Sequence, residues 1–183
     1  MKQQRTIMNS EAVARTLERL AFEILERHGD CHELALLGIQ RRGVDLAQRL
    51  KAQLEPRLGC VLPMGKLDIN LYRDDWTNLT HQPQINLTDV PFPIDGMQLI
   101  VVDDVLFSGR TIRAALEAIL DYGRPRKVEL LVLVDRGHRE LPSQADYVGR
   151  KVSTRKDEHV DVFVKELDGE DKVRLSIEDK DQP

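Results

Sequence analysis

The feature that most constrains the fold is a stretch that opens with four apolar residues at 99–102. Two adjacent acids, Asp103 and Asp104, follow where such a strand is expected to end, and a loop containing Ser108 and Gly109 then leads into an amphipathic helix. A helix N-terminus and loop amides bind phosphate dianions, and paired carboxylates suit a diol or a metal ion. The order of strand, acid pair, loop and helix therefore predicts a site for a phosphorylated sugar.

Strand and helix patterns alternate along the rest of the chain. Apolar residues at helical spacing predict helices over 10–28, with Ser10 as the cap, over 43–54, ended by Pro56, and from 112 to Gly123. Because strands that alternate with helices form mainly parallel sheets covered on both faces, an α/β fold is predicted. The predicted strands are 34–39, 61–71, 99–102, 128–134, 160–164 and 173–177, the last two joined by a turn at 168–169.

Composition sets limits on the class of protein. The 183 residues are enough for one domain with a hydrophobic core, and no repeat or second domain is indicated. No apolar run reaches the length of a membrane span, and the first residues lack the apolar core of a signal peptide. The two cysteines, Cys31 and Cys60, lack metal-ligand spacing, which favours reduced structural thiols and a cytoplasmic location.

The charge is acidic overall but unevenly distributed. A net charge of −4 argues against bulk nucleic-acid binding. Residues 124–156 nevertheless carry nine Lys or Arg against four Asp or Glu, and residues 157–183 carry four against ten. The basic segment is therefore either a surface for a polyanion or a solvated face compensated by acids nearby.

The stretch from 99 to 111 resembles the phosphoribosyl diphosphate (PRPP) motif of the type I phosphoribosyltransferases. It combines the apolar run, the two acids and a Gly two residues before Thr111. The resemblance implies an α/β domain with a mainly parallel central sheet flanked by helices and with a small hood region. We expect a single domain over residues 1–183, with the hood formed mainly by about residues 136–183.

The same resemblance implies Mg²⁺ as the cofactor and PRPP as a co-substrate. Asp103 and Asp104 would hold the ribose hydroxyls, directly or through Mg²⁺, and would place negative charge beside a developing oxocarbenium ion. Together with Arg41 they are the expected catalytic residues. The 5′-phosphate is expected to bind the loop and helix start formed by Val105, Leu106, Phe107, Ser108, Gly109, Arg110 and Thr111.

A second loop, from Gly38 to Gly43, lies between a predicted strand and a predicted helix. By itself it would be an ordinary helix entry with surface arginines. Beside the PRPP motif it resembles the pyrophosphate loop of the family, in which a non-proline cis peptide bond is common. Guanidinium groups fit phosphate oxygens. The expected pyrophosphate ligands are Gln40, Arg41, Arg42 and Gly43.

Two more loops are expected at the same rim, because ligands of parallel α/β sheets bind beyond the carboxyl ends of the strands. One would be a flexible lid that keeps PRPP from water. The other would cover the base and read uracil mainly through backbone groups, and its His138 is expected to be a structural or surface residue. The lid residues are Tyr72, Arg73 and Asp74, and the uracil residues are Val134, Asp135, Arg136 and Gly137.

Similarity in segments 38–43, 67–75, 99–111 and 133–149 narrows the resemblance to one bifunctional branch of the family. The branch implies a pentosyl transferase that converts uracil and PRPP to UMP and diphosphate. It also implies regulation of pyrimidine biosynthesis genes through UMP-dependent binding to leader mRNA and transcription attenuation. The partners expected from it are leader RNA and a second copy of the chain, in a homodimer or dimer-based oligomer, and no membrane.

Basic side chains on the first helix and near residue 150 are the expected RNA contacts. Phe22, on the polar side of that helix, is expected either to stack on a base or to pack in a dimer contact. Two alternatives stay open: a uracil salvage enzyme without RNA binding, and a nucleotide sensor that only uses the fold. The acid pair and Arg41 argue against the sensor. The expected RNA contacts are Arg15, Arg19, Arg150, Lys151, Arg155 and Lys156.

Overall fold

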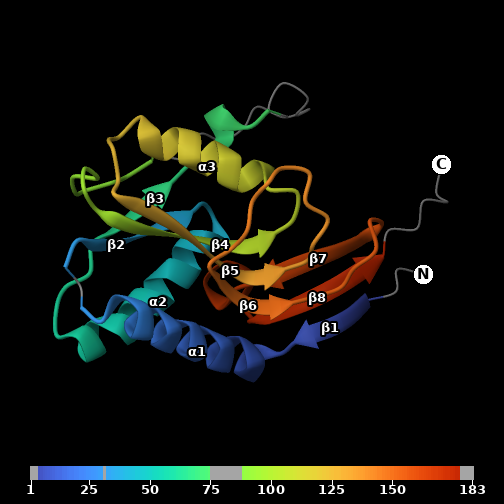
Figure 1. Ribbon diagram of the computed structural model, residues 1–183. Helices are drawn as coiled ribbons and strands as arrows, with labels where there is room; N and C mark the ends of the chain where they lie inside the picture. Colours follow the sequence, from blue (N-terminus) through green and yellow to red (C-terminus); the bar gives the residue numbers. More distant parts are fainter. Residues whose placement is uncertain (1–3, 31, 75–87, 178–183) are drawn as a thin grey trace.

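The computed structural model describes residues 4–30, 32–74 and 88–177. Two sheets and the helices around them make up this part of the chain (Figure 1). The elements in chain order are β1 (Gln4–Met8), α1 (Ser10–His28), β2 (Leu34–Ile39), α2 (Arg42–Leu58), β3 (Met64–Leu67), the 3₁₀ turn η1 (Asn70–Tyr72), β4 (Gln98–Leu106), α3 (Arg110–Leu120), β5 (Lys127–Asp135), β6 (Tyr147–Lys151), β7 (Glu158–Phe163), α4 (Lys165–Asp168) and β8 (Lys172–Ile177).

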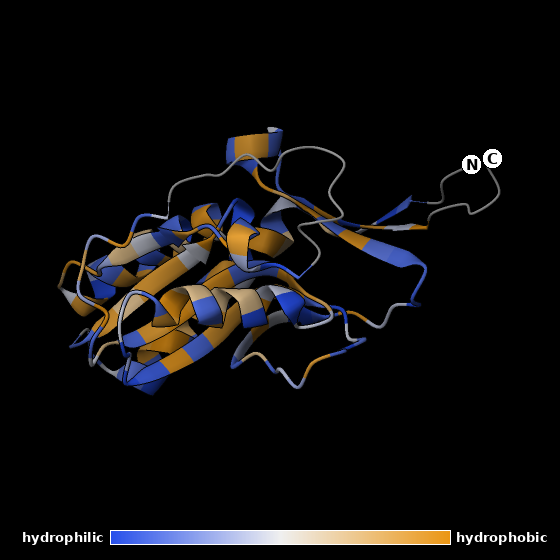
Figure 2. Cartoon of the chain, turned by 90° about the horizontal axis from the view of Figure 1, so that it is seen from above, coloured by the Kyte–Doolittle hydropathy of each residue, from blue (hydrophilic) through white to orange (hydrophobic). Residues whose placement is uncertain are grey.

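The larger sheet has five parallel strands in the order β3-β2-β4-β5-β6. Helices α1 and α2 cover one face and α3 covers the other (Figure 1). Successive side chains of a strand point to opposite faces, so Leu36 and Ile100 pack in the core beneath α1 and α2, whereas Leu37 and Val101 pack beneath α3. Figure 2 shows the resulting apolar strands between helices of mixed polarity. The predicted α/β class is confirmed.

The smaller sheet is antiparallel, with the strand order β1-β8-β7. It lies beside the carboxyl ends of the central strands (Figure 1). Strands β1 and β6 were not expected from the sequence. The first pairs with β8 at the edge of the smaller sheet, and the second pairs with β5 at the edge of the central sheet. Between β7 and β8 the short helix α4 includes Asp168 of the expected turn and ends at Gly169, whose φ is 79°.

Several predicted boundaries are wrong. The cap of α1 is Asn9 and not Ser10, because the Asn9 side chain accepts a hydrogen bond from the Ala12 amide at 2.9 Å. Helix α2 does not end at Pro56 but at Leu58, where Gly59 takes a left-handed conformation and donates to the Glu55 carbonyl. The strand predicted over 61–71 is limited to β3 and gives way to η1.

Cys60 is disulfide-bonded, so the expectation of two reduced thiols is wrong for this residue. The other cysteine of the sequence, Cys31, lies outside the described residues. Cys60 lies between α2 and β3, and sequence spacing alone does not reveal that it is bonded. Within the described ranges, no helix is long and apolar enough to cross a membrane.

Candidate active site

The acid pair lies inside β4 and not after it. This strand stays paired with β5 as far as Leu106, opposite Asp135, so the predicted end at Val102 is four residues too early. The two carboxylates bind successive backbone amides: Asp103 accepts from the Asp104 amide at 2.9 Å, and Asp104 accepts from the Val105 amide at 2.8 Å. Both side chains are half-buried at the carboxyl end of the central strand.

Burial and mutual repulsion oppose ionisation of this pair. Burial, followed by the negative charge of Asp104, raises the pKa of Asp103 well above its usual range, and the positive charge of Arg73 opposes that rise. Burial also raises the pKa of Asp104, partly offset by hydrogen bonds and by Arg42. The nearby arginines compensate the negative charge of the two carboxylates only in part, so a cation bound between them would stabilise their charged forms.

A cavity of about 340 Å³ opens beside Asp103. Its wall includes the start of α3, where Gly109 provides no side-chain cap and the Arg110 amide makes only a long contact of 3.4 Å with the Ser108 hydroxyl, so the amides of this turn can still donate to an anion. Gly109 precedes this helix with a φ of 92°, and a Cβ at this position would lie 2.3 Å from the Ser143 hydroxyl. The predicted PRPP residues that line the cavity are Asp103 and residues 105–111, and the predicted lid residues Arg73 and Asp74 join them.

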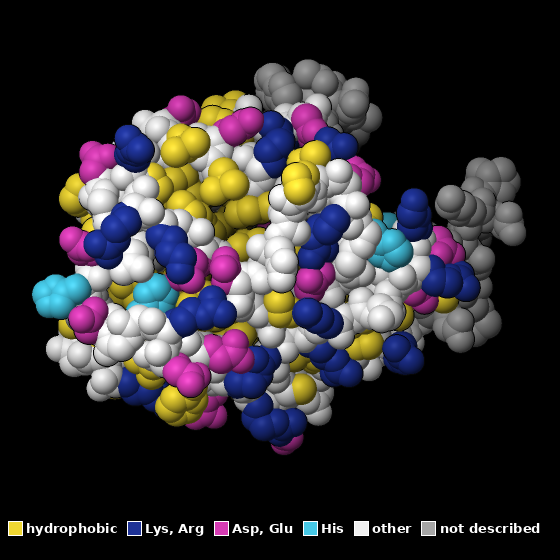
Figure 3. Space-filling view, viewed as in Figure 1, with side chains coloured by type: hydrophobic (Ala, Val, Ile, Leu, Met, Phe, Trp, Pro, Cys, Tyr) yellow, Lys and Arg dark blue, Asp and Glu magenta, His cyan; other side chains and the backbone are white. Residues whose placement is uncertain are grey.

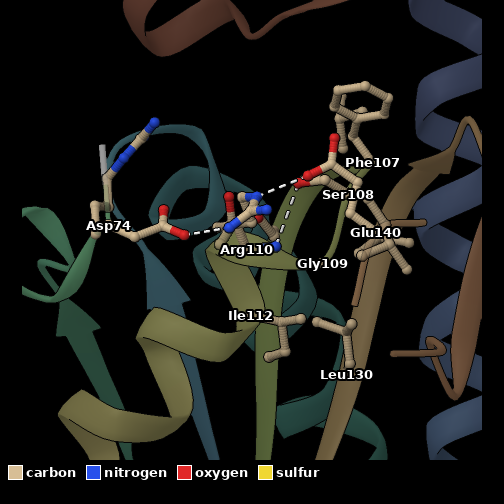
Figure 4. Close-up of a pocket in the computed structure, with 14 residues that line it drawn as sticks. Asp74, Phe107, Ser108, Gly109, Arg110, Ile112, Leu130 and Glu140 are labelled. Carbon is tan, nitrogen blue, oxygen red and sulfur yellow. Dashed lines mark hydrogen bonds and ion pairs between the residues drawn. The ribbon is translucent and has the colours of Figure 1, made fainter. Parts of the chain in front are cut away.

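Two acids flank Arg110 at the mouth of this cavity. Figure 4 shows Asp74 on one side of its guanidinium and Glu140 on the other, with Ile112 and Leu130 beneath. Arg110 is ion-paired with Asp74, and its Nε lies 2.8 Å from a Glu140 carboxylate oxygen. Its side chain thus connects the start of the expected lid to the loop after β5.

The expected lid begins as a segment attached to α3. The Tyr72 hydroxyl donates to Asp121 at 2.6 Å, and this bond, with some burial, raises the pKa of Tyr72 to about 12. Arg113 donates to the Tyr72 carbonyl at 2.8 Å. Residues 75–87 lie outside the described residues. That residues 72–74 close over a ligand stays a prediction.

The predicted pyrophosphate loop connects β2 to α2, and its Gln40–Arg41 peptide bond is cis, as the resemblance implied. A Cβ at Gly43 would lie 2.3 Å from the Val102 carbonyl oxygen, so the loop packs directly on β4 just before the acid pair. Arg41 is exposed. Arg42 forms a two-point ion pair with Asp168 of α4, at 3.0 and 3.3 Å, which the sequence did not indicate.

The predicted uracil residues lie at the end of β5 and just beyond it. Asp135 accepts hydrogen bonds from the Gly137 amide at 2.9 Å and from Arg139 at 2.6 Å. Arg136 is buried, which lowers its pKa, and its guanidinium stacks 4.1 Å from the centroid of the Phe107 ring. A second cavity of about 400 Å³ is lined by residues 135–138 and 151–154.

His138 has the structural role expected of it. Its φ is 60°, and its Nε2 lies 2.6 Å from the Thr154 carbonyl oxygen. This contact fastens the loop after β5 to the segment after β6. Sequence reasoning missed three other side chains near the rim, Arg139, Glu140 and Asp168, because nothing in the local pattern distinguishes them from surface charges.

The predicted RNA residues differ in the hydrogen bonds and ion pairs that they form within the chain. Arg19 donates to the Val148 and Gly149 carbonyls of β6 at 3.1 and 2.6 Å, and Arg155 is paired with Asp157 at 2.7 Å. Arg150 donates to the Ile7 carbonyl, and Arg15 has only a long contact of 3.4 Å with Glu11. On the face drawn in Figure 3, Lys and Arg alternate with Asp and Glu.

Phe22 is 52% exposed on α1, and the Arg57 guanidinium covers its ring at 4.8 Å. This cation–π contact lies within the chain. It holds the ring at the surface and leaves the two predicted roles, stacking on a base and packing in a dimer contact, undecided.

Comparison with known proteins identifies the family. A model of the phosphoribosyl transferase domain matches residues 3–167. The chain is 51% identical to the bifunctional protein PyrR of Pelotomaculum thermopropionicum, over 91% of this chain and 92% of that protein. It is 48% identical to the bifunctional protein PyrR of Elusimicrobium minutum, over 97% of this chain and 99% of that protein.

The chain belongs to the PyrR family of phosphoribosyltransferases. Its membership confirms the predicted enzyme class and favours the bifunctional prediction over a salvage enzyme alone. Solved structures agree on the fold. A hypoxanthine-guanine phosphoribosyltransferase of Bacillus anthracis matches with a TM-score of 0.67 at 18% identity, over 94% of this chain and 97% of that one. A hypoxanthine phosphoribosyltransferase of Trypanosoma cruzi matches with a TM-score of 0.69 at 14% identity, over 96% and 97%.

Proposed function

We propose that this PyrR-family protein transfers the phosphoribosyl group of PRPP to uracil, giving UMP and diphosphate, and that it also binds pyrimidine leader RNA in response to UMP. The observation that carries the enzymatic half is the acid pair of β4 beside a cavity walled by the uncapped start of α3. The relatives at about half identity are called bifunctional, which supports the second half.

The sugar end of PRPP fits between these two features. The amides of residues 106–111 would bind the 5′-phosphate, and Asp103 and Asp104 would bind the ribose hydroxyls. As the bond from the anomeric carbon to diphosphate breaks, positive charge develops on the ribose. Two carboxylates fixed by backbone hydrogen bonds stabilise that charge without having to reorganise.

The diphosphate would leave toward the loop between β2 and α2. Arg41 is exposed there and free to turn its guanidinium toward phosphate oxygens. Arg42 is held by Asp168 of α4, so it would contribute charge while fixing the smaller sheet against the loop. Gln40 and Gly43 complete the proposed pyrophosphate-binding residues.

Mg²⁺ fits the donor set at the acid pair. Within the described residues, no group of three or more His, Cys, Asp or Glu side chains is arranged to hold a metal by itself. Mg²⁺ is commonly held by one or two carboxylates together with substrate oxygens, which is what Asp103 and Asp104 offer. When bound, the ion would neutralise diphosphate charge as the leaving group departs.

Uracil would be read by the backbone of residues 134–137. The Asp135 carboxylate is already used by Gly137 and Arg139, and the Arg136 guanidinium is stacked on Phe107, so these side chains shape the loop. Backbone donors and acceptors are left to recognise the edge of the base. This supports the prediction that uracil is recognised mainly through main-chain groups.

We place the proposed RNA-binding surface beside the same loop. In the sheet register, Val134 and Asp135 pair with Arg150 and Lys151 of β6. A UMP molecule held by residues 134–137 would therefore contact the strand that carries two of the proposed RNA residues. Arg15 and Lys156 extend the proposed surface, which we place on a cytoplasmic homodimer.

Initial rates with uracil and PRPP test the enzymatic half. We expect Mg²⁺-dependent formation of UMP, with uracil preferred to hypoxanthine and guanine. Asp104→Asn should lower kcat by at least about 100-fold, because it removes a preorganised charge beside the reacting carbon. Arg126→Ala changes a charge at the amino end of β5, away from the site, where Arg126 pairs with Glu33 at 2.6 Å, and should leave the rate unchanged. Unaltered kinetics in Asp104→Asn would contradict the assignment.

A further inference from the structure

Arg139 uses all three guanidinium nitrogens to join separate parts of the rim. Its Nη2 donates to the Asp135 carboxylate at 2.6 Å, at the end of β5. Its Nη1 donates to the Phe107 carbonyl at 2.9 Å and to the Gly137 carbonyl at 3.2 Å. Its Nε donates to the Ser143 carbonyl at 3.1 Å. One side chain thus ties the loop over the base to the loop expected to hold the phosphate.

The same two loops are joined by backbone contacts. The Arg136 amide donates to the Leu106 carbonyl at 3.1 Å, and the amides of residues 140 and 141 both donate to the Ser108 carbonyl at 2.9 Å. Three successive carbonyls of the phosphate loop, at residues 106–108, therefore face the loop after β5. The Arg136 guanidinium adds a stack on the Phe107 ring.

This arrangement determines which way the phosphate-loop amides point. A trans peptide unit directs its C=O and its N–H to opposite sides. Because the Phe107 carbonyl is drawn toward Arg139, the amide of Ser108 in the same peptide unit points the other way. Likewise, because the Ser108 carbonyl accepts from the amides of residues 140 and 141, the Gly109 amide points away from that loop. Both residues line the cavity beside Asp103.

Arg139 also shapes the opposite end of the site. Its partner Asp135 accepts the Gly137 amide with its other oxygen, and the Gly137 carbonyl returns to Arg139. Losing Arg139 would release the base loop and the phosphate loop together. A lysine could not replace it, because a single ammonium group cannot reach Asp135, Phe107 and Ser143 in the fixed geometry of a guanidinium fork.

We propose that Arg139 is a positioning residue that orients the phosphate-loop amides and the base loop as one unit, so that both ends of a nucleotide monophosphate are bound. This rests on the proposed function, because UMP is the nucleotide taken to span both loops. Arg139 itself touches neither the reacting carbon nor the leaving group. Its loss should therefore act on affinity for UMP and PRPP more than on the chemical step.

The test measures UMP binding by calorimetry, together with the KM for PRPP and kcat, in wild type, Arg139→Ala, Arg139→Lys and Arg126→Ala. We expect both Arg139 variants to bind UMP about 10- to 100-fold more weakly, the loss typical of charge-assisted hydrogen bonds, with a similar rise in KM and a smaller fall in kcat. Millimolar guanidinium ion should restore part of the affinity of Arg139→Ala. Arg126→Ala should match wild type.

Two results would overturn the inference. One is a UMP affinity of Arg139→Lys that stays within about twofold of wild type. This variant keeps the test decisive if Arg139→Ala fails to fold. The other is a lower kcat with unchanged KM and unchanged UMP affinity, which indicates only fewer folded molecules. A wild-type protein that neither binds nor makes UMP would instead overturn the proposed function, and this inference with it.

Discussion

Asp103 and Asp104 stand side by side at a half-buried strand end, and the protein holds them there against their own repulsion. Burial and the neighbouring carboxylate raise the pKa of Asp103, so the folded state disfavours its charged form. The proposed binding of sugar hydroxyls and Mg²⁺ requires that charged form. The pair is therefore a local cost to stability that we attribute to function, as strained or repulsive groups at active sites often are.

Asp103→Asn should separate stability from activity. A carboxyl group whose folded-state pKa is raised favours folding at low pH, and this contribution is lost as pH rises through the folded-state pKa. At pH 7 the neutral amide removes the repulsion while its oxygen still accepts the Asp104 amide. We expect a higher free energy of unfolding at pH 7, no gain near pH 3, and kcat lower by at least about 100-fold. Urea denaturation at both pH values and initial rates measure this; a less stable variant at pH 7 would contradict it.

Glu129 is a buried acid whose pKa is lowered, in contrast to that of Asp103. Its side chain is 1% exposed within β5, with Lys127 Nζ and His28 Nε2 each 2.8 Å from a carboxylate oxygen. Burial alone would raise the pKa of Glu129, but the Lys127 hydrogen bond and the nearby positive charges outweigh it, and the net pKa is lowered. Its contribution to stability is thus present above the usual carboxyl pKa and is lost as pH falls.

Glu129→Gln should lower the free energy of unfolding by about 1–3 kcal/mol at pH 7, because it removes the negative charge that the buried His28 and the half-exposed Lys127 contact. The difference from wild type should shrink as pH falls below the usual carboxyl pKa and through the lowered folded-state pKa, because the wild-type carboxylate then becomes protonated as well. Denaturant titrations across this range measure the effect. Glu11→Gln, at an exposed pair with Arg15, is the control and should change stability by less than about 0.5 kcal/mol. Equal effects of the two substitutions would rule out this role of Glu129.

Among the elements, those with a complete apolar pattern follow from the sequence. Residues 10–28 and 34–39 match α1 and β2 because each buries a full apolar stripe or run. Strands β1 and β6 cannot be predicted in this way, because they expose polar residues and depend on pairing with β8 and β5, which are distant in sequence. The PRPP motif is local and is recognised, whereas Arg139 and Asp168 act across loops distant in sequence and are not.

The turn between β2 and α2 is set by a backbone contact that only glycine permits. A methyl group at Gly43 would meet the Val102 carbonyl oxygen at 2.3 Å and Asp103 Cα at 3.3 Å. Gly43→Ala must therefore move the loop or β4 next to the acid pair. We expect a loss of about 1–3 kcal/mol in the free energy of unfolding and a higher KM for PRPP.

Gly59→Ala is the matched control for this change. Gly59 has a φ of 66° and open space around its Cβ position, so alanine costs roughly 1–2 kcal/mol of backbone strain at a place far from the rim. Its kinetics should equal those of wild type. If Gly43→Ala loses stability but keeps the wild-type KM, the contact with β4 does not position the PRPP site.

At the scale of the whole molecule, the smaller sheet is held to α2 by ion pairs beside the candidate site. Arg49 binds both Glu166, at 2.5 Å, and Asp171, at 2.7 Å, while Arg42 binds Asp168. These contacts place α4 over the pyrophosphate loop. On the other side, the register of β5 with β6 places the base loop next to Arg150 and Lys151. The proposed catalytic and regulatory surfaces thus share one loop.

The sharing of that loop makes the response of RNA binding to UMP the most direct test of a bifunctional protein. The measurement is binding of the purified protein to the leader RNA of its own pyrimidine genes, with and without UMP, near physiological salt and against a scrambled RNA. We expect tight binding that UMP strengthens, and weaker binding as salt rises. Binding no better than to scrambled RNA, by protein that still makes UMP, would contradict the regulatory half and leave an enzyme alone.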